Sequence, residues 1–376
     1  MAYLDNSATT KPCPEAVAAM VEALEENWAN PSALYRLGGD AAAKLRKARL
    51  QVAKAMGAEP TRVFFTAGGT EADNWAIFSA MERMGKRGKH IITTAIEHHA
   101  VLHPMKRLET MGYRVTYLQP DTLGRISVEV LEGALEKDTV LVSMMLVNNE
   151  TGAVLPIREM AKVVHRKCPE AIFHTDAVQG FLKIPFQAKT LGADLISVSS
   201  HKVHGPKGAG ALYISPRLKS FPAFLLGGGQ ESGLRSGTEA MPAICGFGAA
   251  CEAGLAAWKD DIAREAALRD FCIAKLQEIP GVVISGAHDA PHIISASIPG
   301  VPTQNTINLL QDREVFVSAG SACAKGHRSH VLEAMKLSPA VIDGSFRISL
   351  SRFSTQDEIE QLVSAVADTV LQLRKT

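Results

Sequence analysis

The sequence predicts an α/β protein, with a mostly parallel sheet in a large domain and a smaller α+β domain at the C-terminal side. Three observations support this fold class. Short aliphatic or β-branched runs alternate with helical patterns between about residues 60 and 215. A long alanine-rich helical stretch then leads into a second region that contains strands. The chain has 376 residues, 46% of them hydrophobic, enough for a core in two lobes.

The predicted strands are short runs rich in valine, isoleucine, leucine and threonine. Helical patterns separate most of them, which is typical of βαβ units and therefore of parallel pairing. The runs are 63–66, 90–95, 114–118, 139–146, 171–176, 195–200 and 210–214.

Apolar residues recur at helical spacing in 70–85 and 156–167, each after a small or turn-forming residue, so these segments should cover the sheet. Residues 241–279 predict one or two long helices, and 355–374 a final helix. We place the domain boundary near residue 255. Residues 15–255 then form the large domain, and residues 1–14 with 256–376 form the small one. No internal repeat or low-complexity linker separates the two, so they should pack together.

Composition excludes several classes of protein. Lysine and arginine total 40 against 39 for aspartate and glutamate, so no broad field attracts nucleic acid or an acidic membrane. The N-terminus lacks a basic flank followed by an apolar core, and no run is long enough to span a bilayer, so we expect a cytoplasmic protein. The six cysteines form no CxxC pair, which argues against a zinc ribbon or a disulfide framework.

The segment SVSSHKVHGPKGAG (197–210) is the most informative. An apolar strand ends there in a polar cluster with one lysine, Lys202, followed by a glycine-rich turn. Partial burial would lower the pKa of this lysine, and a neutral amine can attack an aldehyde to form a Schiff base. The alternative is a solvated loop lysine.

Two other segments suggest what the lysine binds. In FHTDAVQG, Asp176 closes an apolar strand, where its charge needs a cation such as a pyridinium nitrogen; the alternative is a cap on the next helix. In TAGGTEADN, two glycines and Thr70 form a strand-to-helix turn suited to a phosphate, although glycine-rich turns are common. One cofactor, pyridoxal 5'-phosphate, explains all three features.

Motifs along essentially the whole chain resemble those of the cysteine desulfurases. These enzymes belong to the class V aminotransferase group of fold-type I pyridoxal-phosphate enzymes. The matching segments, in order, are LDNSATT, FTAGGTEADN, EHHAVLHP, VNNETG, HTDAVQG, SSHKVHGPKGAG, GGGQESGLRSGT, SAGSAC and FRISLSRF.

The resemblance implies a role for each matching residue around the cofactor ring. Lys202 carries the cofactor, Asp176 and Gln179 contact the ring, and His98 stacks on it and takes part in proton transfer. Asn149 contacts the phenolic oxygen and the substrate, whereas its neighbour Asn148 is structural.

For the phosphate, the resemblance implies Gly69, Thr70, Ser199 and His201, with Thr238 supplied by a neighbouring subunit. It therefore implies a homodimer whose two active sites span the interface. His99 and His103 lie close to His98 in sequence, but without carboxylate or cysteine ligands at a recognisable spacing they predict no metal site.

Substrate binding and sulfur transfer fall to two further residues. Arg347 matches the arginine that grips the substrate carboxylate, and Arg352 is expected in a structural ion pair. Cys323 in SAGSACAKGHRSH matches the sulfur-accepting cysteine, which the family carries on a mobile loop of the small domain, and basic neighbours favour its thiolate. Cys245, Cys251 and Cys272 are expected to be small core residues.

The implied reaction converts L-cysteine to L-alanine, leaves a persulfide on Cys323 and passes sulfur to an acceptor protein, for iron–sulfur clusters, tRNA or a thiocofactor. Four features depart from the family: Gln230 replaces its usual histidine, DNAATT appears as DNSATT, SGATE appears as AGGTE, and the chain ends at Thr376, where some members have a longer tail that docks a scaffold protein. The alternatives are an aminotransferase or selenocysteine lyase on the same fold, and a non-catalytic binding protein.

Overall fold

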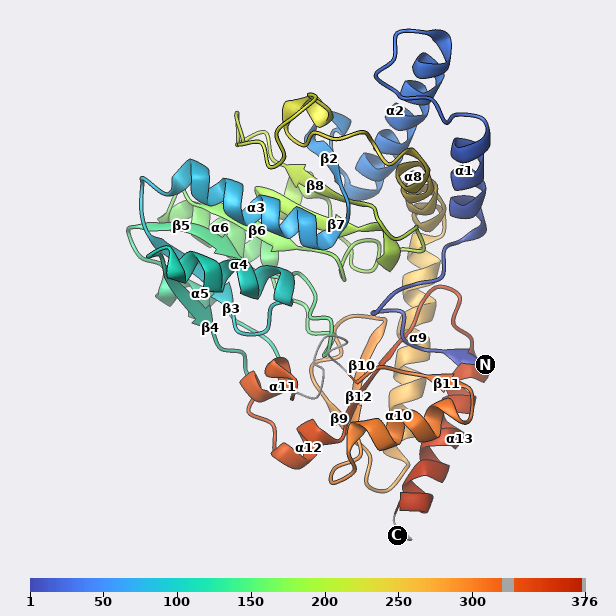
Figure 1. The fold of residues 1–376 in the computed structure, drawn as a ribbon. Helices are drawn as coiled ribbons and strands as arrows, with labels where there is room; N and C mark the ends of the chain where they lie inside the picture. Colours follow the sequence, from blue (N-terminus) through green and yellow to red (C-terminus); the bar gives the residue numbers. More distant parts are fainter. Residues whose placement is uncertain (320–327, 374–376) are drawn as a thin grey trace.

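The computed structural model describes residues 1–319 and 328–373, and its centre is a seven-stranded sheet in the order β2-β8-β7-β6-β5-β3-β4 (Figure 1). Strand β8 is antiparallel to both its neighbours, and the other pairs are parallel, which confirms the predicted fold class. The strands are β2 (Val63–Thr66), β3 (His90–Thr94), β4 (Arg114–Leu118), β5 (Thr139–Ser143), β6 (Ile172–Asp176), β7 (Leu195–Ser199) and β8 (Gly210–Ile214).

Each predicted strand is present; three are one residue shorter than predicted, and one is three residues shorter. The run 139–146 ends as a strand at Ser143, because the chain then turns at Asn148, whose side-chain oxygen accepts hydrogen bonds from the backbone of Glu150 and Thr151. This turn becomes part of the functional site described below.

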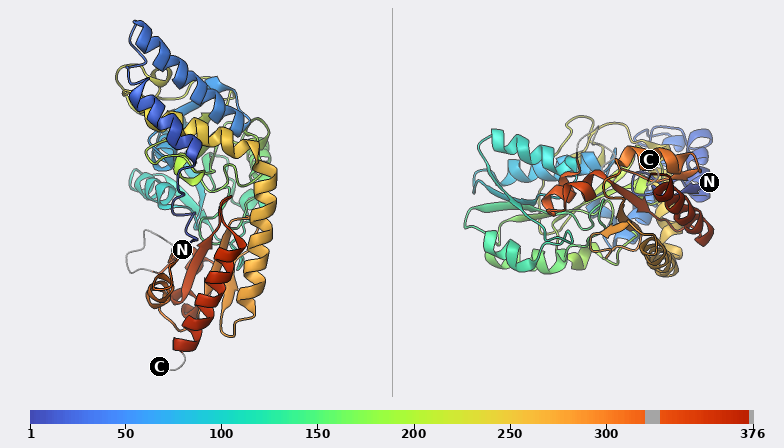
Figure 2. Two further views of the ribbon diagram at one scale, coloured as in Figure 1. Left: turned by 90° about the vertical axis from the view of Figure 1, so that its right-hand side faces the viewer. Right: turned by 90° about the horizontal axis from the view of Figure 1, so that it is seen from below.

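Helices cover both faces of the sheet (Figure 2). Successive strand residues alternate between two cores: Ile91 and Leu141 pack with α3 and α4, whereas Ile92 and Val142 pack with α6. This two-sided burial explains the continuous apolar runs in the sequence. The helices of this region are α3 (Gly69–Met84), α4 (His99–Thr110), α5 (Val128–Ala134), α6 (Ile157–Lys167) and α7 (Ala188–Leu191), with short 3₁₀ turns η1 (Pro60–Arg62), η2 (Ser200–Lys202) and η3 (Glu231–Gly233).

The predicted alanine-rich helix is two helices, α8 (Met241–Ala256) and α9 (Trp258–Gln277), which meet at a bend of 76°. Helices α1 (Pro14–Glu25) and α2 (Arg36–Met56) pack on α8, and α9 runs from there into the smaller C-terminal part (Figure 1). In the described part of the chain, no single helix is long and apolar enough to cross a membrane; only α8 and α9 together, as a bent pair, meet those criteria.

The C-terminal part contains an antiparallel sheet in the order β12-β10-β9 and a parallel pair, β1 with β11. Ala2 and Leu4 lie in its core, so the N-terminus packs with the C-terminal part. Its elements are β1 (Ala2–Tyr3), β9 (Val283–Ser285), β10 (Ile293–Ser297), α10 (Thr303–Gln311), β11 (Val315–Phe316), α11 (His330–Ala334), α12 (Pro339–Asp343), β12 (Ser345–Ser349) and α13 (Gln356–Leu373).

Several residues of the predicted small domain pack with the large part instead. Ala290, Ile293, Val331, Leu332, Met335 and Ile342 belong to the hydrophobic core on the α6 side of the central sheet, not to the C-terminal core. Helix α11 therefore packs against the large part.

All five cysteines in the described part of the chain are buried. Cys245, Cys251 and Cys272 are buried hydrophobic residues, as predicted, and so are Cys13 and Cys168. Cys323 lies outside the described residues.

Candidate active site

A cavity of about 280 Å³ opens at the carboxyl ends of β5, β6 and β7, beside the C-terminal part. Ligands of α/β proteins bind at this edge of the sheet because the loops that follow parallel strands converge there. The cavity is lined by most of the residues that the sequence singled out: Gly69, Thr70, His98, Asn149, Asp176, Gln179, Ser199, His201, Lys202 and Arg347.

Lys202 ends the turn η2 that follows β7, and its side chain is half-buried. Its Nζ donates hydrogen bonds to the carbonyl oxygens of Ser7 (2.6 Å) and Ala8 (2.7 Å). The amine is therefore held in the cavity by the N-terminal segment, which argues against a solvated loop lysine. The motif LDNSATT pointed to this segment, but sequence reasoning gave Ser7 and Ala8 no role.

Asp176 ends β6 deep in the same cavity. Burial raises the pKa of its carboxyl to about 7, with a further contribution from the nearby carboxyl of Asp73. One oxygen accepts a hydrogen bond from the Val178 N–H at 2.8 Å, as in the alternative cap interpretation. That bond favours the charged form but does not outweigh burial, so a cation in the cavity would be bound strongly.

Gln179 and the turn after β5 complete the walls beside Asp176. The Gln179 side chain donates a hydrogen bond to the Ser7 carbonyl at 2.9 Å. Asn148 is fully buried and holds the turn with its side chain, which agrees with a structural role. Its neighbour Asn149 lines the cavity.

An anion-binding end lies where α3 begins. Gly69 and Thr70 are the first residues of α3, next to Ser199, whose buried hydroxyl has no hydrogen-bond partner within the described chain. A Cβ on Gly69 would lie 2.8 Å from the Val178 side chain, so glycine is needed for the close packing here. A helix N-terminus with an unpaired hydroxyl suits a phosphate group.

His201 also faces this end. Its Nδ1 lies 3.1 Å from the Thr9 hydroxyl. Burial, followed by the charges of Lys202 and Lys207, lowers its pKa to about 4, so it is neutral at pH 7.

His98 is the N-cap of α4, and its Nδ1 accepts a hydrogen bond from the Ala100 N–H at 3.1 Å. The neutral ring therefore carries its proton on Nε2. Burial, then the charge of Lys202, lowers the pKa of His98 to about 4. The residue is thus a neutral hydrogen-bonding group at pH 7.

His330, which sequence reasoning missed, also lines the cavity and lies beside His99. The ring centroids of His99 and His330 are 5.0 Å apart, and those of His99 and His103 are 5.1 Å apart. Over residues 1–319 and 328–373, no group of three or more histidine, cysteine, aspartate or glutamate side chains could hold a metal ion.

Arg347 lies in the middle of β12, paired with Ser295 of β10, and only 2% of it is exposed. Its guanidinium donates hydrogen bonds to the Asn149 carbonyl and to the Asp5 carboxylate, both at 2.8 Å. These contacts orient the guanidinium at the cavity wall.

Arg352 forms no ion pair within the described chain, so that prediction is wrong there. Its guanidinium instead lies over the Phe353 ring, 5.0 Å from the centroid, because an exposed aromatic ring is its neighbour in sequence.

Thr238 is exposed and lies outside the cavity wall. Its loop is held by two contacts: Gln230 accepts a hydrogen bond from the Gly237 N–H at 2.9 Å, and Glu231 forms a two-point ion pair with Arg49 at 2.7 Å. Gln230, the departure from the family pattern, therefore supports the backbone next to Thr238.

A lysine amine, a buried carboxyl and a phosphate-type helix N-terminus converge at the carboxyl edge of this sheet. Together they define an enzyme site of the fold-type I pyridoxal-phosphate class: the amine suits the aldehyde, the carboxyl suits the pyridinium nitrogen, and the unpaired Ser199 hydroxyl suits the phosphate.

Comparisons with known proteins narrow this class. The family model described as "Aminotransferase class-V" matches residues 2–362. The cysteine desulfurase IscS of Methanosarcina thermophila is 40% identical over 377 aligned positions, covering 99% of this chain and 92% of the relative. The chain belongs to the aminotransferase class-V family and, within it, to the cysteine desulfurases.

Solved structures agree. A NifS-like protein matches with a TM-score of 0.93 and 35% identity, covering 100% of both chains. The protein SspA, solved in complex with cysteine, matches with a TM-score of 0.82 and 33% identity over 94% of this chain and 100% of SspA.

Proposed function

We propose that this chain is a cysteine desulfurase that uses pyridoxal 5'-phosphate to convert L-cysteine to L-alanine. The observation that carries the proposal is the position of the Lys202 amine, which two carbonyl oxygens hold in the cavity whose floor includes Asp176. When bound, the cofactor supplies an electron sink for the bonds broken at the substrate Cα and Cβ.

Residues of the chain bind and orient the cofactor. Lys202 holds the cofactor covalently, and Asp176 keeps a positive charge at the ring nitrogen because only a cation offsets its own burial. Gly69, Thr70, Ser199 and His201 bind the phosphate. Gln179 and Asn149 contact the ring from the sides.

His98 is suited to stack against the ring and move a proton. Its Nδ1 is occupied by the Ala100 N–H, so Nε2 is the atom that exchanges protons with the substrate or with Lys202. The neighbouring Lys202 amine lowers the proton affinity of His98, and a neutral Lys202 would raise it again.

L-cysteine is the substrate that fits best. Arg347 offers a buried guanidinium for its carboxylate, next to the Asn149 turn. The similar protein SspA was solved with cysteine, which supports an amino acid of this size in the cavity.

The sulfur acceptor is proposed to be Cys323. Burial raises the pKa of all five described cysteines, so none of them offers a reactive thiolate at pH 7. In the reaction, the Cβ–S bond of the substrate breaks and its sulfur joins Cys323 Sγ as a persulfide; protonation of the remaining three-carbon unit gives alanine.

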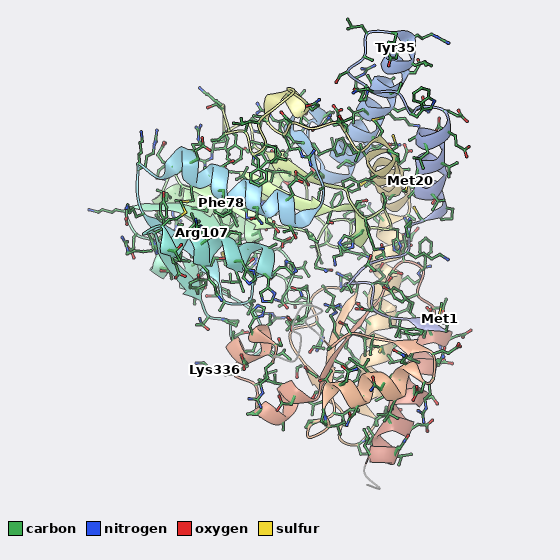
Figure 3. All side chains as sticks on the ribbon, in the orientation of Figure 1. Met1, Met20, Tyr35, Phe78, Arg107 and Lys336 are labelled. Atoms are coloured by element: carbon green, nitrogen blue, oxygen red, sulfur yellow. The ribbon has the colours of Figure 1, made fainter. Side chains whose placement is uncertain are left out.

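A homodimer is also proposed, because of the position of Thr238 and because of exposed apolar side chains. Thr238 lies outside the cavity of its own chain, and the phosphate end of the cavity opens on an outer groove. The helices α1 and α2 and the loop between them, near the labelled Met20 and Tyr35 at the top of the molecule (Figure 3), also expose apolar side chains that a second subunit could cover. These are Val17, Val21, Leu24, Trp28, Leu34, Tyr35, Leu37 and Leu50.

The persulfide sulfur would pass to an acceptor protein for iron–sulfur cluster assembly, tRNA thiolation or thiocofactor synthesis, in the cytoplasm. The IscS names of several relatives favour the iron–sulfur pathway.

The decisive test is product stoichiometry. The purified protein, loaded with pyridoxal phosphate and given L-cysteine and a reducing thiol, should release alanine and sulfide in equal amounts. An aminotransferase would yield a keto acid with no sulfide, and a non-catalytic binding protein would yield neither.

Replacing Arg347 should mainly weaken cysteine binding. We expect Arg347→Ala to raise KM by about 10- to 100-fold, the loss of one charge-assisted contact present in both ground and transition states. Arg347→Lys should be intermediate, because an ammonium keeps the charge but cannot form the two-point contact. Steady-state alanine formation over a range of cysteine concentrations measures this, and an unchanged KM in both variants would refute the assignment.

A further inference from the structure

The turn of residues 148–151 connects the substrate arginine to the large domain. The Asn148 side-chain oxygen accepts hydrogen bonds from the Glu150 N–H (3.0 Å) and the Thr151 N–H (2.9 Å), so the turn is rigidly held. The Asn149 carbonyl accepts from Arg347 at 2.8 Å. This short turn is therefore fixed relative to the place where the substrate carboxylate is proposed to bind.

Glu150, in the same turn, has a side chain that none of the proposed roles uses. It lines the cavity, is 3% exposed, and accepts a hydrogen bond from the Ser329 hydroxyl. Burial raises its pKa, while that hydroxyl and the nearby His330 and Arg347 act in the opposite direction. A buried carboxyl costs stability unless its contacts compensate, so this hydrogen bond calls for an explanation.

Ser329 is the second residue that the structure describes after Cys323; the first, Arg328, forms a two-point ion pair with Asp343 of α12 at 2.6 Å. It is 6% exposed and is the N-cap of α11, where its Oγ also accepts from the Leu332 N–H at 3.1 Å. The next residue, His330, has its Nε2 3.0 Å from the Glu97 carbonyl, and Val331 packs in the core of the large part. The chain after Cys323 is thus attached to α12 through Arg328, and to the large domain from Ser329 onward.

The chain before Cys323 is attached to Arg347 instead. The backbone of Ser318 and the backbone of Arg347 exchange two hydrogen bonds, at 3.1 and 2.7 Å. The described residues on both sides of Cys323 are therefore linked to the 148–151 turn. Ser318 is linked to it through Arg347, and Ser329 bonds directly to Glu150 of the turn.

We propose that Glu150 is a positioning residue for sulfur transfer: through Ser329 it fixes where the chain carrying Cys323 joins the large domain, next to the turn that holds Arg347. This inference rests on the proposed desulfurase function. It assigns Glu150 to the transfer of sulfur to Cys323 and not to the binding of cysteine or cofactor.

The variants Glu150→Ala and Ser329→Ala test this role, with Glu150→Gln as the conservative variant and Ser338→Ala as the matched control. Ser338 also precedes a short helix, α12, but is exposed and makes no side-chain cap bond. In Glu150→Gln, the side-chain amide oxygen can still accept a hydrogen bond from Ser329. Glu150→Ala leaves the bond between Ser329 and Leu332 in place, so it separates the anchor from helix capping.

In a single turnover without reductant, we expect Glu150→Ala and Ser329→Ala to form the Cys323 persulfide about tenfold more slowly than the wild type, the effect of losing one buried hydrogen bond. Cysteine KM and cofactor absorbance should stay near wild-type values, because Arg347 contacts the backbone of the turn. The double variant should be no slower than the slower single variant, since both remove the same bond. Glu150→Gln and Ser338→Ala should resemble the wild type.

Amide hydrogen exchange gives a readout independent of catalysis. The backbone of α11 should exchange faster in cofactor-free Glu150→Ala than in the wild type or in Ser338→Ala. Unchanged exchange, or a Glu150→Ala variant with a normal persulfide rate, overturns the inference. If the wild type forms no persulfide while α11 exchange still responds to Glu150→Ala, the anchor stands and the proposed sulfur transfer fails.

Discussion

Lys202→Ala should abolish turnover and covalent cofactor attachment. The amine forms the covalent link and takes part in proton transfer, so we expect alanine and sulfide production to fall by at least about 10³-fold. The Ser7 and Ala8 carbonyls hold this amine at the carboxyl edge of the sheet, a position that no other lysine lining the described cavity takes. Treating the wild type with borohydride should fix the cofactor to the peptide containing residue 202, whereas the variant should lose its cofactor on denaturation.

Lys219→Ala is the matched control, because Lys219 is exposed and lies outside the cavity. It should keep full activity. A Lys202→Ala variant that retains cofactor fixed by borohydride would show that another lysine carries it.

The same variant tests the proposed dimer. Lys202→Ala subunits mixed with Thr238→Ala subunits should form hybrids with one intact site, if Thr238 serves the site of the partner. Cofactor retention above that of the Thr238→Ala homodimer supports shared sites. A monomer in sedimentation would exclude them.

Cys323→Ser should spare the cofactor and stop sulfur transfer. Serine has almost the same size but a hydroxyl of much higher pKa, so Lys202, Asp176 and Arg347 are unaffected while the attacking thiolate is lost. We expect sulfide release to fall by about 10²-fold or more, with cysteine binding and its early spectral changes retained. In the wild type, a single turnover without reductant should add one sulfur atom to the peptide containing Cys323, visible by mass spectrometry and removed by a thiol.

Cys168→Ser is the control for this substitution. Cys168 is buried, burial raises its pKa, and its sulfur donates a hydrogen bond to the Glu136 carbonyl at 3.3 Å, which serine can also make. Sulfide release at the wild-type rate from Cys323→Ser would favour elimination on the cofactor alone, as in a selenocysteine lyase.

The local pattern of residues in the sequence predicted most of the secondary structure and most of the cavity residues. The seven strands of the central sheet and helices α3, α6 and α13 follow their predicted ranges closely, because apolar periodicity reports which residues each element buries. The motifs also identified most cavity residues, since the turns after β6 and β7 carry their chemistry within a few residues of sequence.

Only the tertiary structure showed which residues distant in sequence contact these turns. The Ser7 carbonyl accepts from Lys202, 195 residues away, and Asp5 accepts from Arg347, 342 residues away, so no local pattern could pair them. The packing of α11 against the core of the central sheet also appeared only in three dimensions, because an apolar helix face does not specify which core covers it.

The sequence by itself determined the fold class, the family motifs and the candidate lysine, carboxyl and arginine. It could not determine their protonation, since the neutral His98 and the raised pKa of Asp176 both arise from burial among neighbours distant in sequence. It also gave no role to Glu150, whose contact with Ser329 exists only because the turn after β5 and the start of α11 meet at one cavity wall. Packing decided these features because the free energy of a charge or a hydrogen bond depends on what surrounds it in space.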